Sequence, residues 1–160
     1  MTIPVRPETD RRIDELKTAF PHPGSALLPA LHLIQEERGH ISTESMDYVA
    51  GKIGVSPAYV AGVVSFYTLF HRRPVGRYHI QLCRTLPCAL RGCGAILEHL
   101  ERRLGIREGE TTPDGKFSLT TVECLGTCDT APMFQINDEE HGRLDPGRVD
   151  AILGSLKQGE

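Results

Sequence analysis

The sequence predicts an α+β protein in which a small N-terminal bundle of helices precedes an α/β layered domain. Along the first part of the chain, apolar residues recur at spacings of three and four, which is the helical period. After the Pro-Val-Gly turn at 74–76 the period changes, and an alternation typical of a strand begins. We therefore expect two domains, a helical bundle at 1–73 and an α/β domain at 74–160.

Four helices are expected in the first domain, because each periodic stretch is bounded by residues that cap or break helices. The stretches are 8–20 before Pro21, a helix opening at Ser25 and closing at Gly39, 43–53 before Gly54, and a helix opening at Ser56-Pro57. The aromatic run Phe66, Tyr67, Leu69 and Phe70 comes next. It either packs the bundle against the following segment or forms a docking surface for another chain, and the sequence leaves both open.

The second domain is expected to follow the order strand, helix, strand, strand, strand, helix. Periodicity predicts these elements at 77–83, 88–104, 117–122, about 133–136, about 142–144 and in a last helix capped by Asp145-Pro146.

The composition excludes several classes of function. Eighteen basic and 21 acidic residues leave a formal net charge of −3, which provides no basic footprint for nucleic acid or for an anionic membrane surface. No stretch approaches the roughly 20 apolar residues that a membrane-spanning helix needs, and the first residues lack the apolar core of a secretory signal. We expect a soluble, cytoplasmic protein without direct membrane insertion.

The cysteines are the most informative residues. All five lie in the second domain, at Cys83, Cys88, Cys93, Cys124 and Cys128. An odd number of cysteines in a cytoplasmic chain argues against a disulfide framework, because cytoplasmic thiols are kept reduced. A metal site or a redox site is therefore the better interpretation.

Four of these cysteines are expected to converge at one edge of the sheet. Cys83 ends the first strand and Cys88 begins the next helix, whereas Cys124 and Cys128 follow the second strand. If the two strands are parallel neighbours, both loops emerge at the carboxyl edge, where open α/β sheets bind their ligands. These four residues, spaced Cys-x4-Cys and Cys-x3-Cys, are the candidate metal and cofactor ligands.

Three kinds of chemistry suit four such thiols. Thiolates bind zinc in a closed tetrahedral site, as in a zinc-stabilised binding module, or iron together with inorganic sulfide. The gaps here are wider than a Cys-x2-Cys zinc knuckle, which favours a larger [2Fe–2S] cluster while staying within the range of zinc. A thiol oxidoreductase is the third alternative, although the sequence contains no Cys-x-x-Cys pair.

Cys93 is left outside the candidate site. Cys83, Cys88 and Cys93 are evenly spaced, so Cys93 could in principle replace Cys88 as a ligand. However, Cys93 lies more than a turn into the predicted helix, away from the strand edge. A free cysteine between a helix and a sheet is the ordinary interpretation. The sequence contains no nucleotide-binding or hydrolase motif, so no catalytic residue is assigned.

Several segments carry a family resemblance. They are Cys83-x4-Cys88-Ala-Leu-Arg-Gly, Glu123-Cys-Leu-Gly-Thr-Cys with Ala131-Pro132, Ala26-Leu-Leu-Pro-Ala-Leu with Gln35-Glu-Glu, Val63-Val-Ser-Phe-Tyr, and the segment 109–117. Together they extend over nearly the whole chain from about residue 13. The chain thus resembles the 24 kDa (E) subunit family of NADH:quinone oxidoreductase (complex I).

The resemblance implies a thioredoxin-like ferredoxin domain that holds one [2Fe–2S] cluster on Cys83, Cys88, Cys124 and Cys128. It implies an electron carrier beside a larger flavoprotein subunit that holds FMN and binds NADH. Further subunits would complete a complex that is peripheral at the cytoplasmic face of the inner membrane. Because NAD-linked hydrogenases and formate dehydrogenases contain related subunits, an equivalent diaphorase subunit is the alternative. Such folds place a proline beside the active loop, so we expect a cis bond at Ala131-Pro132.

Overall fold

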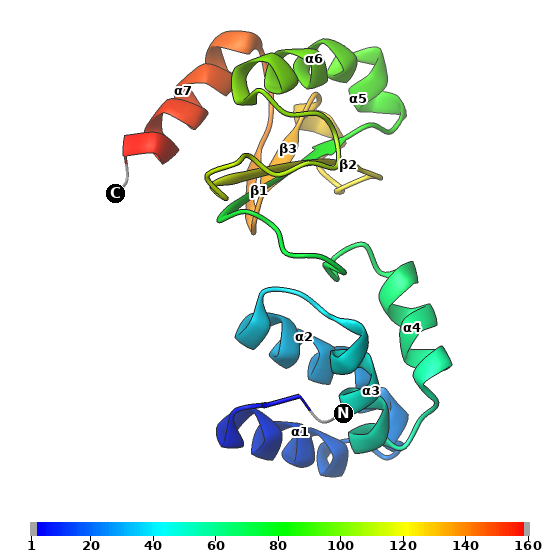
Figure 1. Cartoon of the computed structure of the whole chain (residues 1–160). Coiled ribbons are helices and arrows are strands. Elements are labelled where there is room, and N and C mark those ends of the chain that lie inside the picture. Colours follow the sequence, from blue (N-terminus) through cyan, green and yellow to red (C-terminus); the bar gives the residue numbers. More distant parts are fainter. Residues whose placement is uncertain (1–2, 159–160) are drawn as a thin grey trace. The chain divides into compact units, whose positions relative to one another are not determined.

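The computed structural model describes residues 3–158, which divide between Pro74 and Val75 into two compact units. Figure 1 shows helices in the N-terminal unit and a sheet with further helices in the C-terminal unit. Each unit has its own cluster of buried apolar residues. The expected α+β class is confirmed.

The helices of the N-terminal unit end where their capping residues predict. They are α1 (Pro7–Ala19), the 3₁₀ segment η1 (Pro23–Ala26), α2 (Leu27–Arg38), α3 (Thr43–Ile53) and α4 (Pro57–Phe66). Gly39 and Gly54 end α2 and α3 with φ of +77° and +82°, the left-handed conformation that glycine adopts without strain. Ser56 caps α4 by accepting a hydrogen bond from the backbone N–H of Tyr59.

The start of α2 differs from the prediction. Ser25 is not its N-cap but lies inside η1, and α2 follows Ala26 with no side-chain cap. The reason is that η1 runs directly into α2, so the backbone N–H of Leu27 already bonds to the carbonyl of Gly24. The 3₁₀ turn of η1 thus provides a hydrogen-bond acceptor for a backbone N–H at the start of α2, which a capping side chain would otherwise provide.

Apolar residues from all four α-helices form the core of the N-terminal unit. Its fully buried members include Ile13, Leu31, Ile34, Val49 and Val60. No single helix within residues 3–158 is long and apolar enough to cross a membrane. Taken together, α3 and α4 meet that length and composition, but they are bent by 119° where they join.

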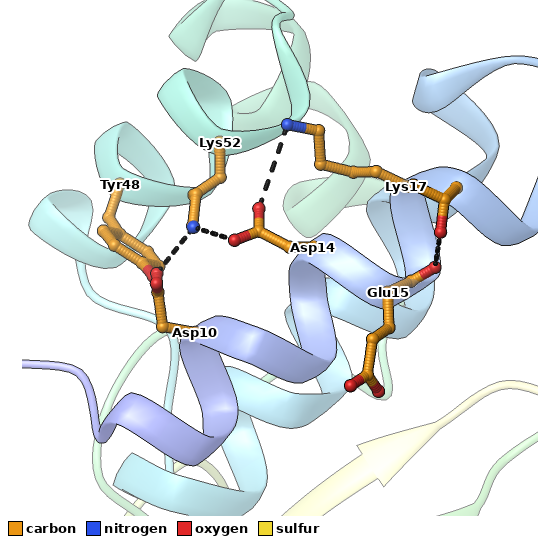
Figure 2. A network of polar contacts seen from close by, with 7 residues as sticks. Asp10, Asp14, Glu15, Lys17, Tyr48 and Lys52 are labelled. Carbon is orange, nitrogen blue, oxygen red and sulfur yellow. Dashed lines mark hydrogen bonds and ion pairs between the residues drawn. The ribbon is translucent and has the colours of Figure 1, made fainter.

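A polar network at the surface fixes α1 to α3 (Figure 2). The Lys52 ammonium lies 2.8 Å from a carboxylate oxygen of Asp10 and 2.8 Å from one of Asp14, and the Tyr48 hydroxyl donates to Asp10. Hydrogen bonds from Lys52 and Tyr48 lower the pKa of Asp10, despite an opposing effect of burial. The network therefore stabilises the fold while Asp10 is ionised, and this contribution is lost as the pH falls through the lowered pKa.

The aromatic run that begins at the last residue of α4 is divided between core and surface. Phe70 is buried in the core of the N-terminal unit, where its ring centroid lies 5.1 Å from that of His32. Phe66 is 77% exposed, and Tyr67 and Leu69 are also exposed. Phe70 therefore packs within the bundle itself, and packing of the run against the following segment and a docking role for Phe66 both stay predictions.

The C-terminal unit contains a four-stranded mixed sheet in the order β2-β1-β3-β4. Its strands are β1 (Tyr78–Cys83), β2 (Phe117–Val122), β3 (Phe134–Ile136) and β4 (Glu139–His141). β1 pairs with β2 in parallel, whereas β3 is antiparallel to both β1 and β4. The condition on which the expected convergence of the cysteines depends, a parallel pairing of the first two strands, is therefore met.

The last strand lies earlier than the predicted 142–144. Asn137 has a φ of +53°, and the tight turn at 137–138 already pairs Ile136 with Glu139. The strand consequently begins in Glu139-Glu140, whose charged side chains provide no apolar alternation to reveal it.

The predicted helix at 88–104 is two helices. They are α5 (Leu86–Leu90) and α6 (Cys93–Leu104), separated at Gly92, which has a φ of +86° and interrupts the helical backbone. α6 packs against β1, β2 and the last helix α7 (Pro146–Gln158), and Figure 1 shows α5 and α6 on the same side of the sheet. Asp145 caps α7 as expected, accepting a hydrogen bond of 2.8 Å from Arg148 N.

Candidate metal centre

The parallel pairing of β1 and β2 brings both cysteine segments to the same edge of the sheet. Cys83, the last residue of β1, lies opposite Val122, the last residue of β2. The backbone N–H of Arg84 bonds to the carbonyl of Val122 and extends this pairing by one step. Cys124 therefore leaves the sheet directly beside Cys83, as the sequence argument requires.

The first cysteine pair is buried and belongs to regular secondary structure. Cys83 ends β1 and Cys88 lies in α5, and the Cys88 thiol donates a hydrogen bond to Cys83. Burial would raise the pKa of Cys83, but hydrogen bonds from Thr85, Cys88 and the backbone of Leu125 outweigh it and lower the pKa. Burial and the bond to Cys83 raise the pKa of Cys88 to about 11. In this pair the thiolate form is therefore favoured on Cys83 over Cys88.

The second pair is exposed and lies in a loop. The sulfurs of Cys124 and Cys128 are 3.6 Å apart, and the backbone N–H of Gly126 donates to Cys124 Sγ at 3.4 Å. These two contacts, that from Gly126 being the larger, lower the pKa of Cys124. The bond to Cys124 and burial raise the pKa of Cys128, which begins the short 3₁₀ segment η2 (Cys128–Thr130). Each pair thus contains one sulfur stabilised as a thiolate and one that donates to it.

Residues that the sequence argument did not single out connect the two pairs. The hydroxyl oxygen of Thr85 lies 3.2 Å from Cys83 Sγ, and the same hydroxyl is near enough to Cys124 to contribute to the lowered pKa of that thiol. An exposed ion pair of 3.1 Å between Arg84 and Glu123 joins the same two segments. The signal available in the sequence was position alone, since each of these residues stands next to a ligand or between two of them.

The arrangement of the thiols fits a [2Fe–2S] group. Within residues 3–158, no three His, Cys, Asp or Glu side chains are gathered so as to hold one metal ion. The four thiols form two pairs, which is the ligand set of a centre with two irons and two cysteines on each. Thr127 has a buried hydroxyl oxygen with no hydrogen-bond partner among the described residues, and a sulfur-rich group would give it one.

Cys93 lies closer to the pairs than the sequence suggests. It is not more than a turn into a helix but is the first residue of α6, because the chain breaks at Gly92. It is buried, and burial followed by the charge of Cys83 raises its pKa. The Ala131–Pro132 bond is cis, which confirms the expectation of a cis bond there.

Comparison with known proteins places this geometry in a family. The thioredoxin-like [2Fe-2S] ferredoxin profile matches residues 13–157. The E 2 subunit of NADH-quinone oxidoreductase from Rhizobium meliloti (strain 1021) is 48% identical over 148 residues, which are 92% of this chain and 88% of that protein. NADH-quinone oxidoreductase subunit 2 of Thermus thermophilus is 40% identical over 151 residues, with 92% and 83% covered.

A solved structure shares the fold as well. The crystal structure of an NAD+-reducing [NiFe]-hydrogenase in the H2-reduced state matches with a TM-score of 0.71 and 28% identity over 84% of this chain. This chain spans only 22% of that longer hydrogenase chain. From the profile and the curated relatives, the chain belongs to the thioredoxin-like [2Fe-2S] ferredoxin family.

Proposed function

We propose that this chain is the iron–sulfur electron-transfer subunit of NADH:quinone oxidoreductase (complex I), which exchanges single electrons with the FMN of an adjacent NADH-binding subunit. The observation that carries the proposal is the pairing of Cys83 with Cys88 and of Cys124 with Cys128 at one sheet edge. Relatives of 48% and 40% identity are named as subunits of that enzyme.

In this proposal the four cysteines are the ligands of one [2Fe–2S] cluster per chain. When bound, the cluster supplies a centre that accepts and releases one electron at a time. The chain positions the ligands through two different devices. Burial of Cys83 and Cys88 excludes water from one side, and the Gly126 N–H stabilises the Cys124 thiolate on the other.

A partner surface beside the ligands supports electron exchange with another protein. Leu86 and Leu90 are four residues apart on α5 and are 70% and 78% exposed. Cys88, which lies between them in the sequence, is buried. Exposed apolar side chains at such a position favour docking, and electron transfer needs a partner close to the centre. FMN and NADH would belong to that partner, and this chain would be a peripheral subunit on the cytoplasmic side of the membrane.

The second candidate is the equivalent subunit of an NAD-linked hydrogenase or formate dehydrogenase. The match to the NAD+-reducing hydrogenase structure favours it, but at 28% identity it is weaker than the 48% to the respiratory relative. Co-expression with the NADH-binding flavoprotein of each type of complex would separate them. The respiratory assignment predicts a stable complex with the respiratory flavoprotein and a weaker one with the hydrogenase protein.

The electron-carrier role is tested on the chain itself. We would purify it without oxygen, assay iron and acid-labile sulfide, and record the visible spectrum before and after dithionite. About two irons and two sulfides per chain, with absorption that bleaches on reduction, is the expected result. A colourless protein with one zinc would contradict the proposal and support a zinc-stabilised binding module.

A further inference from the structure

We propose that the Thr85 hydroxyl donates a hydrogen bond to a cysteine sulfur of the metal centre and that this bond raises the reduction potential of the centre. The inference rests on the proposed [2Fe–2S] function and assigns a positioning residue within that site. It starts from the contact of 3.2 Å between Thr85 Oγ1 and Cys83 Sγ.

Thr85 occupies the N-cap position of α5, yet its side chain does not cap that helix. A threonine at this position ordinarily accepts a hydrogen bond from a backbone N–H of the first turn. Here the hydroxyl is directed at Cys83 instead. Because the side chain does not make the usual capping contact, capping of α5 does not account for its orientation.

The same hydroxyl reaches the second cysteine segment. Thr85 also lies near Cys124, the first cysteine of that segment. Thr85 is therefore within reach of one sulfur from each pair. Because a hydroxyl has one proton, it donates to one of these two sulfurs at a time.

Metal binding determines the direction of this hydrogen bond. Between a hydroxyl and a thiol, either group can be the donor of the 3.2 Å contact. A cysteine that binds a metal is a thiolate, which has no proton and can only accept. The Thr85 O–H is then the only possible donor in this contact, and its proton places partial positive charge against the ligand sulfur.

The electrostatic consequence follows from the charge of the two redox states. One-electron reduction makes the thiolate-ligated centre more negative, so a hydrogen bond to its sulfur stabilises the reduced state more than the oxidised state. Cys83 is only 2% exposed, which limits competition from water for the same sulfur. The Thr85 bond therefore raises the reduction potential.

The test compares wild type with Thr85→Val, because valine keeps the shape of threonine and removes only the hydroxyl. Both proteins are purified without oxygen and titrated with redox mediators while the visible absorption and the EPR signal are followed. We expect full iron and sulfide content in the variant and a midpoint potential more negative than that of wild type. Thr85→Ser, which keeps the hydroxyl, should return the potential toward the wild-type value.

Two further measurements separate hydrogen bonding from structural effects. Thr121→Val is the matched control, and its potential should equal that of wild type. The Thr121 hydroxyl contacts the Glu108 carboxylate, and among residues 3–158 it contacts no sulfur. After exchange into D2O, pulsed EPR of the reduced protein should lose one exchangeable deuteron coupling in Thr85→Val. Thr85→Ala is a second variant without the hydroxyl and should match Thr85→Val.

The outcomes are distinct. An unchanged potential in Thr85→Val at full iron content overturns the inference while leaving the electron-carrier function standing. Loss of iron with an unchanged potential in the remaining centres assigns Thr85 a structural role and also overturns it. A wild-type chain that binds no iron and sulfide overturns the proposed function itself.

Discussion

The two cysteine segments reach the same edge of the sheet by opposite structural routes. Cys83 and Cys88 are buried, in the last residue of β1 and within α5, so the core of the C-terminal unit positions them. Cys124 and Cys128 are exposed, in a loop and at the start of η2, where the Gly126 N–H and the contact between the two sulfurs position them. The comparison indicates that one half of the centre is a product of core packing and the other half of loop geometry.

The largest effects are expected from substituting one ligand of each segment. Cys83→Ser and Cys124→Ser should both lose the cluster, seen as loss of iron, sulfide and visible absorption. The two variants should differ in their free energy of unfolding when both are free of iron. Cys83→Ser buries a hydroxyl in the core and should lower the free energy of unfolding by about 1–2 kcal/mol, whereas exposed Cys124→Ser should leave it nearly unchanged.

Urea unfolding of the iron-free proteins measures this difference. Equal stabilities of the two variants would contradict the contrast between a packed and an unpacked segment. A normal cluster spectrum in Cys124→Ser would remove that residue from the ligand set.

A backbone change in the loop is expected to have the next largest effect. Gly126 has a φ of +94°, and a Cβ there would meet no atom within 4 Å, so Gly126→Ala introduces backbone strain without a clash. The strain costs about 1–2 kcal/mol and should displace the N–H that donates to Cys124. We expect faster loss of iron to a chelator, followed by the decay of visible absorption.

Gly94→Ala is the control for that experiment. Gly94 lies in α6 with no positive φ, and a Cβ there would also meet no atom within 4 Å. Its rate of iron loss should match that of wild type. A rate of iron loss in Gly126→Ala equal to that of wild type would show that the Gly126 N–H does not position the Cys124 sulfur.

The ion pair between the segments is expected to contribute little. Arg84 and Glu123 are both exposed, so Arg84→Ala should lower the free energy of unfolding by less than about 1 kcal/mol, and about 1 M salt should remove the difference. A double-mutant cycle with Glu123→Ala at low and high salt measures the coupling. A large coupling that persists in salt would mean that the two segments are held together before they bind a metal.

The smallest effect is expected at Cys93. Although Cys93 is buried close to Cys83, it is assigned no ligand role, so Cys93→Ser should leave the cluster spectrum and iron content nearly unchanged. Absorption and EPR spectra of the purified variant provide the check. Loss of the cluster would show that the first segment contributes Cys93 as a ligand, and the assignment of Cys88 would then have to be revised.

Elements with local signals were predicted most accurately. Gly39, Gly54, Ser56 and Asp145 end or begin helices where expected, because a cap depends on a few neighbouring backbone groups. The break at Gly92 was missed because apolar spacing continues through it, and only the positive φ interrupts the helix. β4 was placed too late because an edge strand of charged residues carries no apolar pattern.

The sequence by itself determined the α+β class and the two closely spaced pairs of cysteines. These properties depend on periodicity and on spacing along the chain, which a sequence contains in full. Only the tertiary structure decided that one pair is buried and the other exposed, that Cys93 begins α6, and that Thr85 turns from its helix toward Cys83. Burial depends on contacts between segments far apart in the chain. The break at Gly92 and the direction of the Thr85 hydroxyl are local, but apolar periodicity encodes neither of them.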